Sequence, residues 1–183
     1  MYWNVIRAVA PGLAALAVFG GVLVGGPVAS AAEPAPAVPA PREMRDLVRM
    51  PRSELEALYL ASPPANPPSG FAPGRAIKNP GGRFTAANSR LTGVAWQCKI
   101  FRDDGTMINR VFGFGKAIPA RVYQGESVID GQPSLIFDYS GSKLWPDVRD
   151  EVREVEPGLY LGVMYKGRPN AQQKMFFTLD ARK

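Results

Sequence analysis

Residues 99–112 decide the fold of this 183-residue chain, and they run Lys99-Ile100-Phe101-Arg102-Asp103-Asp104-Gly105-Thr106-Met107-Ile108-Asn109-Arg110-Val111-Phe112. Two short apolar runs flank the turn residues Asp104 and Gly105. An Asp-Gly pair between apolar runs is a strong hairpin signal, because glycine readily takes the positive φ that a tight turn needs. The stretch therefore predicts two antiparallel strands.

The same period-two pattern continues to the C-terminus, with short runs about ten residues apart. The predicted strands that follow the hairpin are 117–123, 134–140, 148–155, 159–166 and 174–179. No link between them is long enough for a parallel crossover helix, so the pattern predicts an antiparallel meander. We expect a mainly β fold of about seven or eight strands, which closes into a barrel because closure removes the edges.

One or two helices are expected before the meander. Residues 42–62 have helical spacing interrupted by Pro51, with a capping box at Ser53, and they end before Pro63. A short strand is expected at 71–77, and a short helix at 85–97 leads into a strand near Cys98. The predicted strand Leu159–Tyr165 is apolar on both faces, so the helix at 53–61 is a candidate cover for its outer face.

The N-terminus predicts export. Residues 1–31 have a basic start, a long uncharged apolar middle and an Ala29-Ser30-Ala31 exit, which are the marks of a signal peptide. An uncleaved membrane anchor is the alternative, and it would keep the domain near a membrane. Residues 32–41 form a Pro/Ala-rich spacer and residues 42–183 the helix-plus-barrel domain. We therefore expect a secreted or periplasmic protein.

Composition excludes several chemistries. The chain has no histidine, which removes histidine-based nucleophile activation and the commonest transition-metal sites. Its one cysteine, Cys98, cannot form an intramolecular disulfide, and its apolar context favours a buried thiol. The net charge of +6 is scattered rather than clustered, so no nucleic-acid partner is expected. We expect no cofactor and no metal.

The order of elements resembles the lipocalin-like (calycin) barrels, in particular small bacterial ones. A helix and a proline-rich loop lead to Gly70-Phe71-Ala72-Pro73-Gly74 and then to a hairpin meander. Ala72 stands where such families often carry a tryptophan, and Trp96 is the candidate to supply an aromatic floor instead. The resemblance implies a central cavity for apolar small molecules.

Seven side chains are candidates for contacting a ligand, each with an ordinary structural alternative. They are Arg121, Tyr123, Asp138, Tyr139, Arg153, Tyr160 and Tyr165. Asp138 lies in an apolar strand, either as a polar group in the lumen or on the solvent face beside an arginine. The tyrosines line a cavity or fill a core. The alternating charges of residues 147–154 favour a solvated strand that protects an edge.

The leading functional prediction is a non-catalytic module that binds an apolar or amphipathic small molecule, of the lipid or fatty-acid class. In this hypothesis an inward Arg153 holds a carboxylate head, and the tail lies along Leu161 and Val163. One alternative is a structural domain of the cell envelope with a filled core. The other is a carboxylate-dependent hydrolase or isomerase that uses Asp138 with Tyr139 or Glu151. No oligomeric state is predicted.

Overall fold

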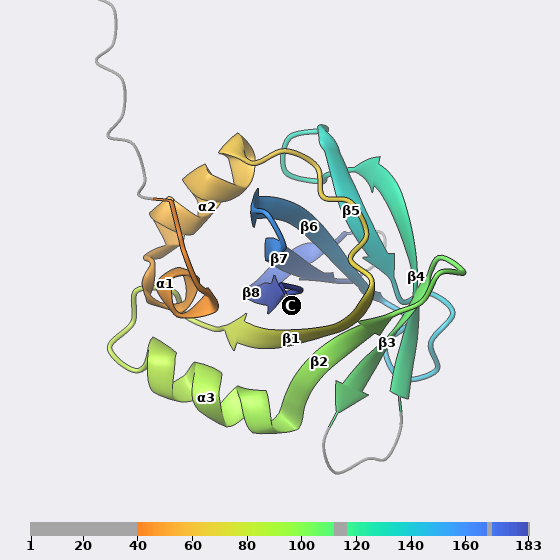
Figure 1. Cartoon of the computed structure of the whole chain (residues 1–183), viewed down its shortest axis with the longest axis horizontal. Helices are drawn as coiled ribbons and strands as arrows, with labels where there is room; N and C mark the ends of the chain where they lie inside the picture. Colours follow the sequence, from red (N-terminus) through yellow and green to blue (C-terminus); the bar gives the residue numbers. More distant parts are fainter. Residues whose placement is uncertain (1–39, 112–116, 168–169, 183) are drawn as a thin grey trace, which may run out of the picture. The chain divides into compact units, whose positions relative to one another are not determined.

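The strands of the computed structural model close into a barrel (Figure 1). The structure describes residues 40–111, 117–167 and 170–182, so the predicted signal peptide and nearly all of the spacer lie outside the described residues. The strand order around the barrel is β1-β2-β3-β4-β5-β6-β7-β8, with every neighbouring pair antiparallel. The predicted mainly β fold, an antiparallel meander that closes, is confirmed.

The elements follow one another along the chain with short links. The helices in the described part are α1 (Met44–Arg49), α2 (Arg52–Ala61) and α3 (Thr85–Ala95). The strands are β1 (Gly70–Ile77), β2 (Trp96–Phe101), β3 (Thr106–Val111), β4 (Ala117–Glu126), β5 (Pro133–Asp138), β6 (Val148–Glu156), β7 (Leu159–Lys166) and β8 (Gln172–Asp180). The predicted helix that leads directly into a strand is thus present as α3 and β2.

The barrel closes through β1, which divides its pairing between two neighbours. Its first half, residues 70–73, pairs with β2, and its second half, residues 74–77, pairs with β8. The hairpin that the Asp-Gly signal predicts joins β2 to β3, with Phe101 opposite Met107 and Gly105 at a φ of 74°. That positive φ explains why glycine occupies the turn.

Strand β7 is apolar on both faces because a helix covers the outer one, as the sequence predicts. Leu159, Leu161 and Val163 pack in one buried cluster with Leu55 and Tyr59 of α2. The residues between them face the lumen. One of these is Gly162, where a Cβ would lie 2.1 Å from Cζ of Phe177, so only glycine fits beneath that ring.

The predicted capping box at Ser53 is wrong. Helix α2 begins at Arg52 with Pro51 as its N-cap, so Ser53 lies inside the helix. The reciprocal box lies one helix earlier, where Glu43 and Asp46 cap α1. The interruption at Pro51 separates two helices, because proline fixes an extended entry into α2 and lacks the N–H that would continue α1.

The prediction of a solvated edge strand at residues 147–154 is also wrong. Strand β6 lies between β5 and β7, and three of its charged side chains are buried: Asp150, Glu151 and Arg153. Each has an oppositely charged partner, which makes burial tolerable.

Within the part of the chain that the structure describes, no helix has the length and apolarity needed to cross a membrane.

Candidate functional site

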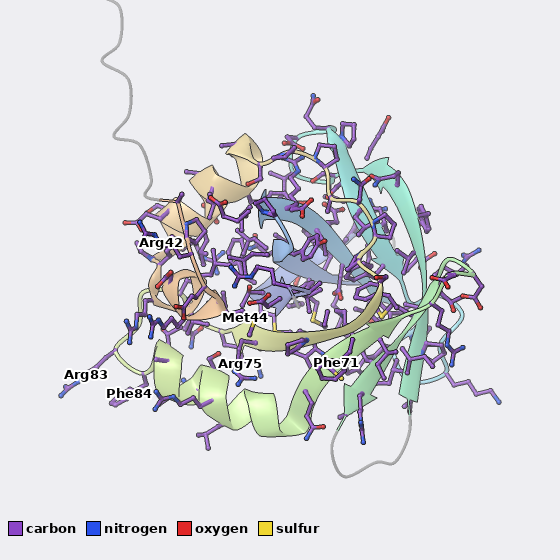
Figure 2. The ribbon with its side chains drawn as sticks, in the orientation of Figure 1. Arg42, Met44, Phe71, Arg75, Arg83 and Phe84 are labelled. Carbon is purple, nitrogen blue, oxygen red and sulfur yellow. The ribbon has the colours of Figure 1, made fainter. Side chains whose placement is uncertain are left out.

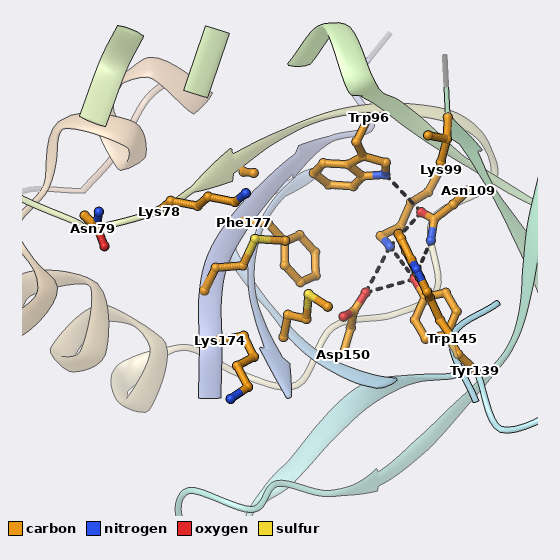
Figure 3. A pocket seen from close by; sticks show the side chains of 14 residues that line it. Lys78, Asn79, Trp96, Lys99, Asn109, Tyr139, Trp145, Asp150, Lys174 and Phe177 are labelled. Carbon is orange, nitrogen blue, oxygen red and sulfur yellow. Dashed lines mark hydrogen bonds and ion pairs between the residues drawn. The ribbon is translucent and has the colours of Figure 1, made fainter. Parts of the chain in front are cut away.

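A cavity of about 500 Å³ opens into the barrel lumen (Figure 3). Most of its wall is apolar, and the larger apolar side chains in it are Trp96, Val111, Trp145, Met164, Met175 and Phe177. The tryptophan of the predicted aromatic floor, Trp96, is therefore part of this wall. It packs against β1 where Gly74 leaves room, since a Cβ on Gly74 would lie 2.6 Å from its ring.

The polar centre of the cavity is the ammonium group of Lys99, whose side chain is 2% exposed. Its Nζ donates to Oδ1 of Asn109 at 2.9 Å, to the hydroxyl of Tyr139 at 2.7 Å and to Oδ2 of Asp150 at 3.0 Å. A lysine ammonium has three hydrogens. All three are used, so Lys99 is fully satisfied by the protein.

The partners of Lys99 also bind one another, and we call Trp96, Lys99, Asn109, Tyr139 and Asp150 the Lys99 network. The Tyr139 hydroxyl donates to Oδ2 of Asp150 at 3.0 Å and accepts from Nδ2 of Asn109 at 2.7 Å. Nε1 of Trp96 donates to Oδ1 of Asn109 at 3.0 Å. These bonds tie together β2, β3, the residue that follows β5, and β6; the dashed lines in Figure 3 mark them.

Aromatic rings enclose the charge of Lys99. Its Nζ lies 5.1 Å from the ring centroids of Trp96 and Phe137, 5.2 Å from that of Phe177 and 5.4 Å from that of Tyr139. The negative faces of such rings attract a cation within about 6 Å. The rings therefore replace part of the hydration that burial removes.

Burial dominates the titration of the network. It lowers the pKa of Lys99, although the nearby Asp150 carboxylate opposes the shift through its charge and its hydrogen bond. Burial also raises the pKa of Tyr139 well above its usual value, and here Asp150 adds to the shift. Both directions follow from the cost of a charged form in a buried site.

Of the seven predicted ligand residues, Tyr139 alone is among those that line the described cavity. Tyr160 belongs to the interior cluster of the barrel but lies outside the cavity wall. Tyr165 packs on the outer face with α2. Tyr123 is 43% exposed on the outer face of β4, where it cannot line the lumen.

Asp138 lies outside the lumen and pairs with an arginine, as its structural alternative predicts, but its own side chain is buried rather than solvated. It alternates with the inward Phe137 and Tyr139, so it faces outward. There its Oδ2 accepts a 3.0 Å hydrogen bond from Nη2 of Arg121 on the neighbouring strand, and the two side chains form an ion pair. Ser140 also binds the carboxylate, through its N–H and its hydroxyl. The Arg121 side chain is 68% exposed. Neither residue is a polar group of the lumen.

The expected inward arginine is wrong as well. Arg153 is buried on the outer face beneath α2, with its guanidinium 4.6 Å from the ring centroid of Tyr59. It donates to the carbonyl of Tyr59 at 3.0 Å and to both oxygens of Asp130 at 2.7 and 2.9 Å. These bonds lower the pKa of Asp130. Leu161 and Val163, the expected tail contacts, pack in the same helix-covered layer.

The Lys99 network was missed, although the hairpin contains part of its signal. The register places Lys99 opposite Asn109 on strands whose other inward residues are apolar, Phe101 and Met107. A lysine on the apolar face of a predicted hairpin needs a buried anionic partner. Asp150 is not predicted as that partner, because the alternating charges around it favour a solvated strand.

Fold and cavity together define a small closed β-barrel with a pocket in its lumen. No family model matches the sequence, and no curated protein matches it either. The chain is similar to a solved structure, a protein from Thermomonospora curvata, with a TM-score of 0.46 and 22% identity over 74% of this chain and 90% of that one. The fold assignment rests on the strand pairing within this chain itself.

Proposed function

We propose that this chain is an exported, non-catalytic binding module of the lipocalin-like type, which holds an apolar or amphipathic small molecule in its lumen. The observation that carries the proposal is the cavity of about 500 Å³ beside the Lys99 network. Ligand sites of this kind are concave, mainly apolar and furnished with a few fixed polar groups. An eight-stranded barrel is wide enough for one small ligand.

The polar groups of the cavity suggest how an acidic amphiphile lies in it. Lys99 has no hydrogen left to donate, whereas Lys78 and Lys174 line the cavity and are exposed. In Figure 3 these two lysines lie to the left of the view, and Lys99, Asn109 and Tyr139 lie to the right. We therefore place an acidic head group at Lys78 and Lys174, and the apolar tail between Trp96, Met164 and Phe177.

The enzymatic alternative finds less support in the geometry. It requires Asp138 to act together with Tyr139 or Glu151. Asp138 faces outward while Tyr139 faces the lumen, so this pair does not converge. Glu151 is fully buried on the outer face, where Arg149, Ser127 and the backbone N–H of Val128 bind it. An open cavity also favours a binding module over a structural domain with a filled core.

The test of the lumen site is titration of the purified domain with a fluorescent long-chain fatty acid. We expect saturable binding to the wild type. Because Val111 is a half-buried residue of the cavity wall, Val111→Trp should fill part of the space and weaken binding by about tenfold or more. Val128→Trp is the matched control, since Val128 is 56% exposed and outside the cavity wall, and it should bind like the wild type.

A second comparison tests the placement of the head group. Replacing both Lys78 and Lys174 with glutamine should weaken binding of the fatty acid but leave binding of the corresponding fatty alcohol unchanged. Loss of both ligands to the same degree would refute the head-group assignment and retain the pocket. Absence of saturable binding to the wild type would discard the carrier function.

Export is supported by the sequence of residues 1–31 and is tested separately. Protein isolated from its native host should begin near Ala32 when its N-terminus is sequenced. An intact Met1 in the membrane fraction would show an uncleaved anchor instead.

A further inference from the structure

A second cavity, of about 390 Å³, lies outside the barrel between α1, β1, α3 and the C-terminal end of β8 with the residues after it, and it is rich in arginine. Its charged lining residues are Arg45, Arg49, Arg75, Arg90 and Arg182, with the carboxylates Glu43 and Asp180. Arg75 alternates with Gly74 and Ala76, which face the lumen, so its own side chain points outward. Figure 2 shows Arg75 on the α3 side of β1.

The arginines of this cavity are not all neutralised. Arg45 pairs with Glu43 at 3.0 Å and Arg182 pairs with Asp180 at 2.5 Å. Among the described residues, no carboxylate pairs with the other three, which are Arg49, Arg75 and Arg90. Within the described ranges, the Arg75 guanidinium has one hydrogen-bond partner, the carbonyl of Gly74 at 3.1 Å. Three guanidinium groups around one hollow repel each other, most strongly at the half-buried Arg75, and an anion bound between them would offset that repulsion.

A buried hydroxyl in the wall of the cavity gives an independent indication of a ligand. Ser89 of α3 is 2% exposed, and its Oγ has no hydrogen-bond partner within the described ranges. Buried polar groups are nearly always hydrogen-bonded, because an unmet hydroxyl loses its water without replacement. Ser89 lines the same cavity as the three arginines. Its hydroxyl can therefore donate a hydrogen bond to an acceptor atom of a ligand in this cavity.

We propose that this cavity, the α1–α3 cavity, binds a phosphate group through Arg49, Arg75, Arg90 and the hydroxyl of Ser89. The planar fork of a guanidinium matches phosphate oxygens in bidentate fashion. A phosphate offers enough oxygens for three arginines and one hydroxyl, whereas a carboxylate has only two. The group belongs either to a small phosphorylated molecule or to a lipid head group. This site is separate from the lumen pocket and does not depend on its function.

Calorimetric titration of the purified domain with inorganic phosphate, at constant ionic strength, tests the site. We expect saturable binding and a raised melting temperature, with no such effect from chloride. The double variant Arg49→Gln/Arg90→Gln should bind phosphate about tenfold or more weakly than the wild type. Arg102→Gln/Arg110→Gln removes the same charge at exposed positions outside this cavity and should bind like the wild type. Ser89→Ala should weaken binding by about threefold to tenfold through the lost donor.

A second arm distinguishes the two sources of phosphate. Vesicles of phosphatidylcholine with and without phosphatidic acid are sedimented with the wild type and with both double variants. Binding to phosphatidic acid vesicles that Arg49→Gln/Arg90→Gln alone abolishes identifies a lipid head group; binding of inorganic phosphate alone identifies a soluble ligand. An equal response of the two double variants in both arms would overturn the proposal, because it would show unspecific attraction. So would the absence of any binding to the wild type.

Discussion

Lys99→Ala is expected to lower the free energy of unfolding by about 3–5 kcal/mol, because it leaves the Asp150 carboxylate buried without its cation. The substitution also removes the hydrogen bonds that Lys99 donates to Asn109 and Tyr139, and the cation–π contacts of its ammonium group with the surrounding rings. Urea unfolding followed by tryptophan fluorescence measures the change, since Trp96 and Trp145 both line the cavity beside the network.

Two controls separate the ion pair from the loss of side-chain volume. The pair Lys99→Met with Asp150→Leu removes both charges at similar volume, and it should recover most of the stability. Lys174→Ala removes an exposed lysine of the same cavity and should change stability by less than about 0.5 kcal/mol. If Lys99→Ala is as mild as Lys174→Ala, the network contributes nothing to folding.

Stability is expected to fall steeply as the pH rises above 10.0, the ordinary pKa of tyrosine. Burial raises the pKa of Tyr59, Tyr139 and Tyr165, and it raises that of Tyr160 to about 12. An acid whose pKa is raised by folding keeps its proton in the native state and loses it in the unfolded chain. Its stabilisation is complete below the unfolded pKa and is lost as the pH rises toward the folded pKa.

The expected slope is about 1.4 kcal/mol per pH unit for each buried tyrosine that stays protonated. Lys99 acts in the opposite direction, because its lowered pKa makes the native state gain stability with rising pH, but only up to its ordinary value of 10.5. Above that value Lys99 no longer opposes the tyrosines, and the thiol of Cys98, whose pKa is also raised by burial, acts in the same direction as they do. Urea midpoints at a series of alkaline pH values measure the fall.

Tyrosinate absorbance provides the matching control. It should appear together with unfolding rather than before it, except for exposed tyrosines. Tyr165→Phe should reduce the slope, whereas Tyr123→Phe should leave it unchanged because Tyr123 is exposed on the outer face. A stability that stays level from pH 10.0 to pH 12 would contradict the assignment of four buried tyrosines.

Local patterns predicted the architecture well, because its signals are carried by neighbouring residues. The turn at Gly105 and the even spacing of the later strands depend on a few consecutive positions. The cover of Leu161 by α2 followed from a strand that is apolar on both faces. Each of these arguments uses the period of a strand or the conformational needs of a turn, and neither requires knowledge of distant contacts.

The site was not predictable in the same way, because it is assembled from distant parts of the chain. Lys99 and Asp150 are 51 residues apart in sequence and meet only when β2 and β6 face each other across the lumen. The alternating charges of β6 have the appearance of a solvated strand. Arg153 differs from a lumen residue only by the parity of its position, which the sequence pattern of mixed charges does not reveal.

The pairing of β1 with both β2 and β8 has a consequence for the order of events during folding. Strand β8 pairs with β1, which is synthesised about a hundred residues earlier. The contact between these two strands therefore closes a loop that spans more than half of the chain. Contacts between residues far apart in a sequence form late and slow the folding of β proteins. Until β8 arrives, β1 and β7 each present a bare edge to other chains. The interval before closure is thus the period in which this protein is most exposed to self-association, and a chain that ends before Gln172 never leaves it.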